Sequence, residues 1–79
     1  MALHELAERI GDGITVRLWW DTDADEVMVT YVDERKGESF TLYPPRHKAM
    51  DAFEHPNAWP ESARQPLRAL DGQPQPAVL

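Results

Sequence analysis

The chain has 79 residues, no cysteine and a formal net charge of −6, from 8 Lys and Arg residues against 14 Asp and Glu residues. This length allows one small domain, and without cysteine no disulfide can stabilise it. The negative charge argues against nucleic-acid backbones and anionic membranes as partners. No apolar run approaches the roughly 18 residues of a membrane span, and the N-terminus does not resemble a signal peptide, so we expect a cytoplasmic protein.

The first segment has the apolar spacing of a short helix. Its apolar residues recur at positions i, i+3, i+4 and i+7, and they are Leu3, Leu6, Ala7 and Ile10. Gly11 follows as a stop signal. We therefore predict an N-terminal helix over residues 2–10, which would form only by docking on the rest of the domain because a helix this short is marginal alone.

Three later segments alternate with a period of two and are rich in β-branched residues, which predicts strands. They are Ile14–Trp20, Glu26–Val32 and Glu38–Tyr43. The middle strand has no plainly polar face, which favours a central position. The three strands are expected to form an antiparallel meander.

The strand register follows from the requirement that apolar residues share one face. The predicted opposite pairs are Leu18 with Val29, Val16 with Tyr31, Phe40 with Tyr31 and Leu42 with Val29. This register leaves four-residue turns at Thr22–Asp25 and Glu34–Gly37. Gly37 can then adopt a positive φ in the second turn.

A helix is predicted over Pro45–His55, on the core face of the sheet. Ala49, Met50 and Phe53 lie on one stripe at helical spacing, and Pro56 ends the pattern. The fold class is therefore α+β: a short N-terminal helix, a three-stranded antiparallel meander, one helix packed on a sheet face and a Pro-rich C-terminal arm.

The composition changes after Trp59, where four prolines interrupt the chain. We place one α+β domain at residues 1–59 and a partly flexible arm at residues 60–79. Trp59, Leu67 and Leu70 are the residues available to hold this arm against the domain.

The predicted register also creates a second face, opposite the apolar core rows. Trp19, Met28 and Tyr43 form one cross-strand row on it. The candidate partner-interface residues on this face are Arg17, Trp19, Met28, Thr30, Thr41 and Tyr43. Residue types of this kind are enriched at protein interfaces, and an uncovered row would be a sizeable apolar patch. Cover by another part of the same chain is the alternative.

Two groups of residues resemble metal sites. His47, Asp51 and His55 follow one another at i, i+4 and i+8 on the predicted helix, and their side chains are suitable zinc ligands. A polar outer helix face is the interpretation we favour, because consecutive i+4 steps drift around a helix. Asp21, Asp23 and Asp25 have the spacing of a calcium loop but lack its sixth-position Gly and twelfth-position Glu, so we expect a solvated acidic turn.

Nothing in the sequence forms a recognisable nucleophile. Cysteine is absent, and Ser39 and Ser62 lie on a predicted strand and in the Pro-rich arm. We expect neither an enzyme nor a bound cofactor.

Three stretches in the middle of the chain resemble small hypothetical proteins of high-GC actinobacteria. They are Ile14–Asp21 (ITVRLWWD), Val32–Phe40 (VDERKGESF) and Ala52–Pro56 (AFEHP). The resemblance covers about residues 14–59 and implies a bacterial, cytoplasmic origin. It implies no activity, ligand or site.

The sequence therefore predicts a small acidic protein–protein interaction module. It would bind a protein partner or itself, as a homodimer, through the second face. Strand addition at Ile14–Trp20 or Glu38–Tyr43 is a variant of this prediction. The alternative is a protein that binds a metal or small ligand through the helix histidines.

Overall fold

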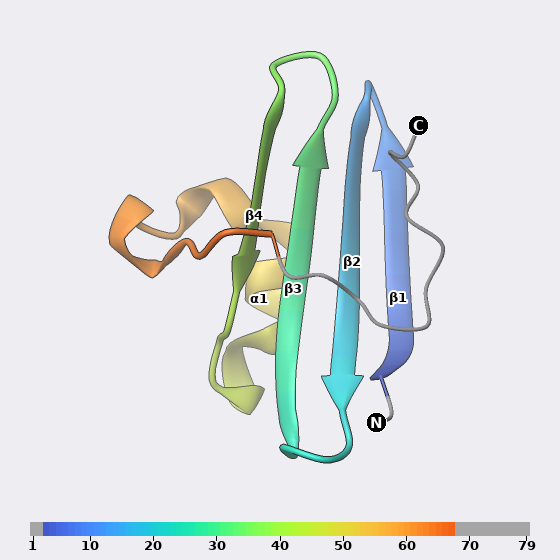
Figure 1. Ribbon diagram of the computed structural model, residues 1–79, viewed down its shortest axis with the longest axis vertical. Helices are drawn as coiled ribbons and strands as arrows, with labels where there is room; N and C mark the ends of the chain where they lie inside the picture. The colour runs from blue at the N-terminus through green and yellow to red at the C-terminus, as the bar shows by residue number, and fades with distance from the viewer. Residues whose placement is uncertain (1–2, 68–79) are drawn as a thin grey trace.

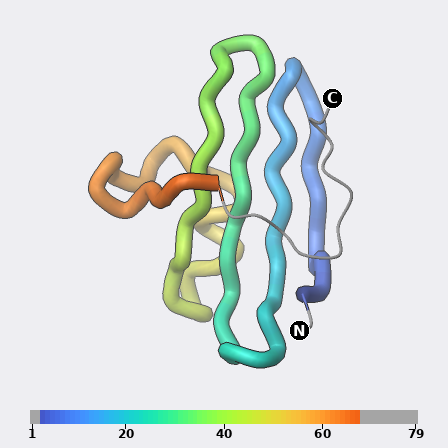
Figure 2. Tube along the Cα trace, viewed as in Figure 1, coloured from blue at the N-terminus to red at the C-terminus, as the bar shows by residue number. Residues whose placement is uncertain are grey.

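The computed structural model describes residues 3–67, which form one antiparallel sheet with a short helix on one face (Figure 1). The strands are β1 Leu3–Gly11, β2 Ile14–Asp21, β3 Glu26–Asp33 and β4 Glu38–Leu42. Their order in the sheet is β1-β2-β3-β4, so each strand lies beside the next one in the sequence (Figure 2). The fold is α+β. Within residues 3–67, no helix is long and apolar enough to cross a membrane.

The predicted N-terminal helix and three-stranded sheet are wrong. Residues Leu3–Gly11 form β1, which pairs antiparallel with β2 from Gly11 opposite Ile14 to Leu3 opposite Asp21. The register shifts between Glu5 and Ala7, as in a β-bulge. The extra residue reverses the in–out alternation, so the strand lacks a continuous period of two and its apolar residues imitate helical spacing.

The turn between β1 and β2 explains why this segment pairs as a strand. Its two central residues, Asp12 and Gly13, have φ values of 53° and 79°. Positive φ at both positions is typical of a type I′ turn, and Asp-Gly is a preferred sequence for it. The turn brings β1 against β2, and the backbone groups of β1 form hydrogen bonds with those of β2. A nine-residue helix would have only its own backbone hydrogen bonds and is marginally stable at that length.

The predicted pairings among the other three strands are observed. Val16 and Leu18 lie opposite Tyr31 and Val29, and β4 continues the same rows. On β4, the partners are Phe40 for Tyr31 and Leu42 for Val29. The rows meet a helix on one face of the sheet, and the buried cluster contains Val16, Leu18, Val29, Tyr31, Phe40, Leu42, Ala49, Ala52 and Phe53.

The turn between β2 and β3 is organised by a buried carboxylate. Asp21 is 5% exposed, and its Oδ1 accepts hydrogen bonds from the backbone N–H groups of Asp23 and Ala24, at 3.0 and 3.2 Å. Asp25, the last turn residue, has a φ of 54°. This carboxylate therefore serves the turn, and its burial departs from the solvated acidic turn predicted for the triplet.

The turn between β3 and β4 repeats this construction. Asp33 is 4% exposed and accepts hydrogen bonds from the N–H groups of Arg35 and Lys36, at 3.0 and 3.2 Å. Gly37 occupies the last position with a φ of 68°, as predicted. Both four-residue turns thus use a buried Asp at the start and a left-handed residue at the end.

The helix on the core face is shorter than predicted. α1 spans Ala49–Glu54 and follows a 3-10 turn, η1, at Arg46–Lys48. Neither element has a side-chain N-cap. η1 carries the basic residues Arg46 and Lys48, whereas the first turn of α1 carries Asp51, whose charge suits the helix dipole. A second 3-10 turn, η2, begins at Pro56 and ends at Ala58. Packing of the buried residues on β2 and β3 therefore holds α1 in place.

Arg9 connects β1 to the end of this helix. Its Nη2 donates to the backbone carbonyls of Phe53 and Glu54, at 2.5 and 3.3 Å, and its guanidinium lies 5.1 Å from the centre of the Phe53 ring. Ala7 is the β1 side chain that packs partly buried against the core. The edge strand is thus held by backbone pairing, one small apolar side chain and this arginine.

The described part of the predicted arm packs against the domain. Trp59 and Ala63 lie against the core, and η3 spans Glu61–Ala63. Gln65 then exchanges two backbone hydrogen bonds with Thr41 on β4, at 2.8 and 2.9 Å. Leu67 is 44% exposed, while Leu70 lies outside the described residues. Ala63 and Gln65 of the predicted arm therefore lie against the sheet.

Substitution of Gly13 by Ala should destabilise the protein by about 1–2 kcal/mol, because a Cβ is strained at positive φ. That Cβ would also lie 2.6 Å from Cγ of Arg35. Gly11→Ala is the matched control, since its Cβ would meet nothing within 4 Å. Denaturant unfolding followed by circular dichroism measures both, and equal losses for the two variants would contradict the assigned turn.

Replacement of Arg9 by Met should cost about 1 kcal/mol of unfolding free energy, because the helix carbonyls lose a charged donor and Phe53 loses its cation. Arg46→Met is the control: Arg46 pairs with Asp25 at the surface, where the side chains are 64% and 65% exposed. We expect a loss below about 0.5 kcal/mol there. A larger loss for Arg46→Met than for Arg9→Met would refute the tie between β1 and α1.

Candidate functional site

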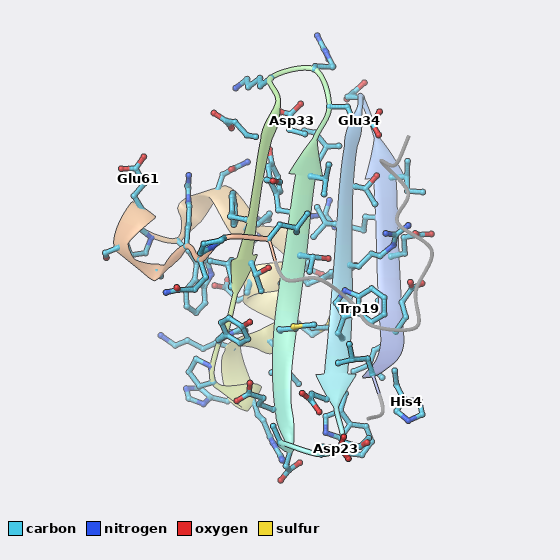
Figure 3. The ribbon with its side chains drawn as sticks, in the orientation of Figure 1. His4, Trp19, Asp23, Asp33, Glu34 and Glu61 are labelled. Atoms are coloured by element: carbon cyan, nitrogen blue, oxygen red, sulfur yellow. The ribbon has the colours of Figure 1, made fainter. Side chains whose placement is uncertain are left out.

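The predicted row on the second face is covered in the folded chain. Trp19 is 2% exposed and Met28 is 1% exposed. Trp19 lies on the side of the sheet turned away from α1 (Figure 3), where its Nε1 donates to Oγ1 of Thr30 at 3.0 Å. Thr41 is buried, and Tyr43 keeps 43% of its surface exposed. The row is therefore not an open apolar patch.

The predicted metal ligands are not brought together. His47 lies in η1, Asp51 in α1, and His55 is the C-cap residue of α1, with φ −133° and its N–H bonded to the carbonyl of Asp51 at 2.8 Å. All three side chains belong to exposed residues. Within residues 3–67, no group of three His, Cys, Asp or Glu side chains is placed to hold a metal ion.

Arg64 lines a hollow beside β4. Its guanidinium lies 4.6 Å from the centre of the Phe40 ring and donates to the carbonyls of Asn57 and Trp59. Its buried Nε has no hydrogen-bond partner among the described residues. The hollow is also lined by the acidic residues Glu38 and Glu61, which would repel an anion. Arg64 therefore serves chiefly to pack the arm on β4.

The two edges of the sheet differ in how they are occupied. At β4, Gln65 pairs with Thr41, one residue before the end of the strand. At the other side, β1 pairs with β2 alone within residues 3–67. The predicted edge at Ile14–Trp20 is consequently an interior strand, and the open edge of the sheet is the outer side of β1.

Two backbone hydrogen-bonded pairs, Thr41 with Gln65 and Glu34 with Gly13, fix the direction of the backbone groups across the sheet. Both backbone groups of Thr41 bond to Gln65, so they point away from β3. In an antiparallel sheet these directions alternate, and Thr30, opposite Thr41, therefore points its groups toward β2. The bond from the N–H of Glu34 to the carbonyl of Gly13, at 2.9 Å, agrees with this alternation.

The same alternation, continued across β2, shows which backbone groups of β1 face β2 and which face away from the sheet. Ala7, Arg9 and Gly11 point their N–H and C=O groups toward β2. Glu8 and Ile10, between them, point theirs outward. The outer edge from Ala7 to Gly11 is regular, since the bulge lies on its N-terminal side. It therefore presents backbone donors and acceptors in the pattern that another strand would pair with.

The side chains beside this edge are apolar and acidic. Ile10 is 70% exposed and Leu6 is 53% exposed. Glu8 and Ile10 lie on the second face, because their cross-strand partners, Arg17 and Thr15, do. An edge strand of this kind is usually protected in a monomer, and here charged residues and the bulge provide the protection.

One arginine serves two carboxylates next to the edge. Arg17 Nε lies 2.7 Å from Glu8 Oε2 and 3.5 Å from Glu5 Oε1. The side chain of Arg17 is 27% exposed, and those of Glu5 and Glu8 are 43% and 33% exposed. The three groups leave one negative charge in excess on the second face beside β1.

The sequence contained one signal for this site that the helical spacing concealed. An Asp-Gly pair between two apolar segments is a strong hairpin indicator, and Asp12-Gly13 is such a pair. If this pair is read as a hairpin turn, residues 3–11 are predicted to form a strand at the edge of the sheet. The bulge near Leu6 has no comparable signal in the sequence.

Comparisons of the chain with protein-family models, with curated proteins and with solved structures gave no match.

Proposed function

We propose that this chain is a small acidic protein–protein interaction module that binds an extended segment of its partner as a fifth strand on β1. The observation that supports this proposal is the outer side of β1, where Glu8 and Ile10 direct their backbone groups away from β2. Strand addition of this kind obtains affinity from main-chain hydrogen bonds and specificity from alternate side chains.

The burial on the second face supports the edge over the face as the binding site. Trp19 and Met28 are 2% and 1% exposed, so self-association through their row would first require their present cover to be removed. The edge requires no such rearrangement. Ile10, at 70% exposure, offers apolar surface that a partner strand would cover.

The scaffold supports the proposal by its rigidity. The Asp12-Gly13 turn joins β1 to β2, and Arg9 links its middle to the end of α1. A strand held in position loses little conformational freedom when a partner binds, which favours affinity. Each main-chain hydrogen bond gained contributes about 0.5–1.5 kcal/mol.

Amide hydrogen exchange measured by nuclear magnetic resonance tests whether the edge is open. The N–H groups of Ala7, Arg9 and Gly11 should exchange slowly because they bond to β2, whereas those of Glu8 and Ile10 should exchange at least tenfold faster. Equal protection along the strand would show that the edge is already occupied in solution, and the proposed site would be rejected.

Substitution of Ile10 by Pro tests the proposed function. Proline removes an outward N–H while leaving the bonds to β2 intact, and proline is tolerated at sheet edges. Extended peptides selected from a phage-displayed library on the native chain should bind Ile10→Pro at least tenfold more weakly. Ile10→Val, which keeps the N–H, is the control and should retain binding.

Circular dichroism checks that both variants are folded. Selected peptides that bind Ile10→Pro as well as the native chain would refute strand addition at β1.

A further inference from the structure

We infer that the strand added to β1 belongs to a different protein and carries a Lys or Arg opposite Glu8 with an apolar residue two positions away, opposite Ile10. This inference rests on the proposed function and specifies the partner. It follows from the charges beside the edge and from the registers that two copies of β1 could adopt.

A second copy of the chain is a poor occupant of this edge. In a symmetric antiparallel pair, outward-facing residues must lie opposite outward-facing residues. If Glu8 is the centre, it meets Glu8 of the second copy. If Glu8 pairs with Ile10, each carboxylate lies opposite an apolar side chain, so neither the charge of Glu8 nor the apolar surface of Ile10 gains a matching partner.

The remaining register with a long overlap extends across the bulge. It would place Leu3 opposite Ile10 of the second copy, and Glu5 then lies opposite Glu8 on both sides of the symmetry axis. Like charges directly opposite one another destabilise a strand pair. The formal net charge of −6 on each copy adds a general repulsion.

The local charge instead fits a basic strand. Glu5 and Glu8 share the single guanidinium of Arg17, which leaves one negative charge in excess beside the edge. A residue paired with Glu8 has its side chain on the same face, within reach of this carboxylate. Arg9 does not oppose such a partner directly, because its guanidinium is bound to the carbonyls of Phe53 and Glu54 on the other face.

The position opposite Ile10 requires a different kind of side chain. Ile10 is 70% exposed on the second face, two residues from Glu8 and on the same side of the strand. An apolar side chain opposite it would bury this surface. The partner therefore alternates basic and apolar residues on one face, with a spacing of two.

Two phage-displayed libraries of eight-residue peptides provide the test. They are identical except that one carries Lys and the other Glu at the fourth position, with Ile fixed two positions away and the remainder randomised. A peptide that binds the native chain but not the Ile10→Pro variant is counted as edge-dependent. We expect the Lys library to yield edge-dependent binders at least fivefold more often than the Glu library.

Matched charge variants assign this preference to the edge. For each binder, the preference is the ratio of its affinities with Lys and with Glu at the fourth position. Glu8→Gln should reduce this ratio about fivefold, whereas Glu38→Gln, which removes one carboxylate from β4, should leave it unchanged. Edge-dependent binders without any charge preference would overturn the inference and keep the proposed function. An absence of edge-dependent binders from both libraries would overturn the two together.

Light scattering coupled to size-exclusion chromatography tests whether a second copy of the chain occupies the edge. The native chain should have the mass of one copy. A native dimer that becomes a folded monomer in Ile10→Pro would make the second copy the occupant, which overturns the inference while the edge remains an interface.

Discussion

The reversal of the chain at Asp12 and Gly13 is the constraint on which the rest of the structure depends. Two successive positive φ values return the chain antiparallel to itself and place β1 in register with β2. The addition of this strand makes β2 an interior strand and moves the open edge to residues Leu3–Gly11. β4 pairs with Gln65 at Thr41, whereas the outer side of β1 has no strand beside it within residues 3–67.

β1 contributes unequally to stability and to recognition. Its main apolar contact with the core is Ala7, while Leu6 and Ile10 remain exposed. The strand is held by backbone pairing and by the bond from Arg9 to the end of α1. Its inner side is thereby committed to the fold, and within residues 3–67 no strand pairs with its outer side, beside which Leu6 and Ile10 are exposed. The proposed strand addition would use this outer side.

The acidic character of the chain has two separate structural origins. Asp21 and Asp33 are buried, and each accepts two backbone N–H groups in a four-residue turn, so these charges organise the hairpins. Glu5 and Glu8 are partly exposed and share one arginine beside the edge, and the proposed basic partner strand would meet these charges.

Local pattern alone determined the pairing of β2, β3 and β4, because their alternation is uninterrupted and a shift of one residue would expose the apolar rows. It also determined the two turns and the positive φ of Gly37. Only the tertiary structure decided the state of residues 3–11, since a bulge removes their period of two and backbone pairing with β2 overrides helical spacing. The burial of Trp19 was likewise decided by packing, which residue spacing does not encode.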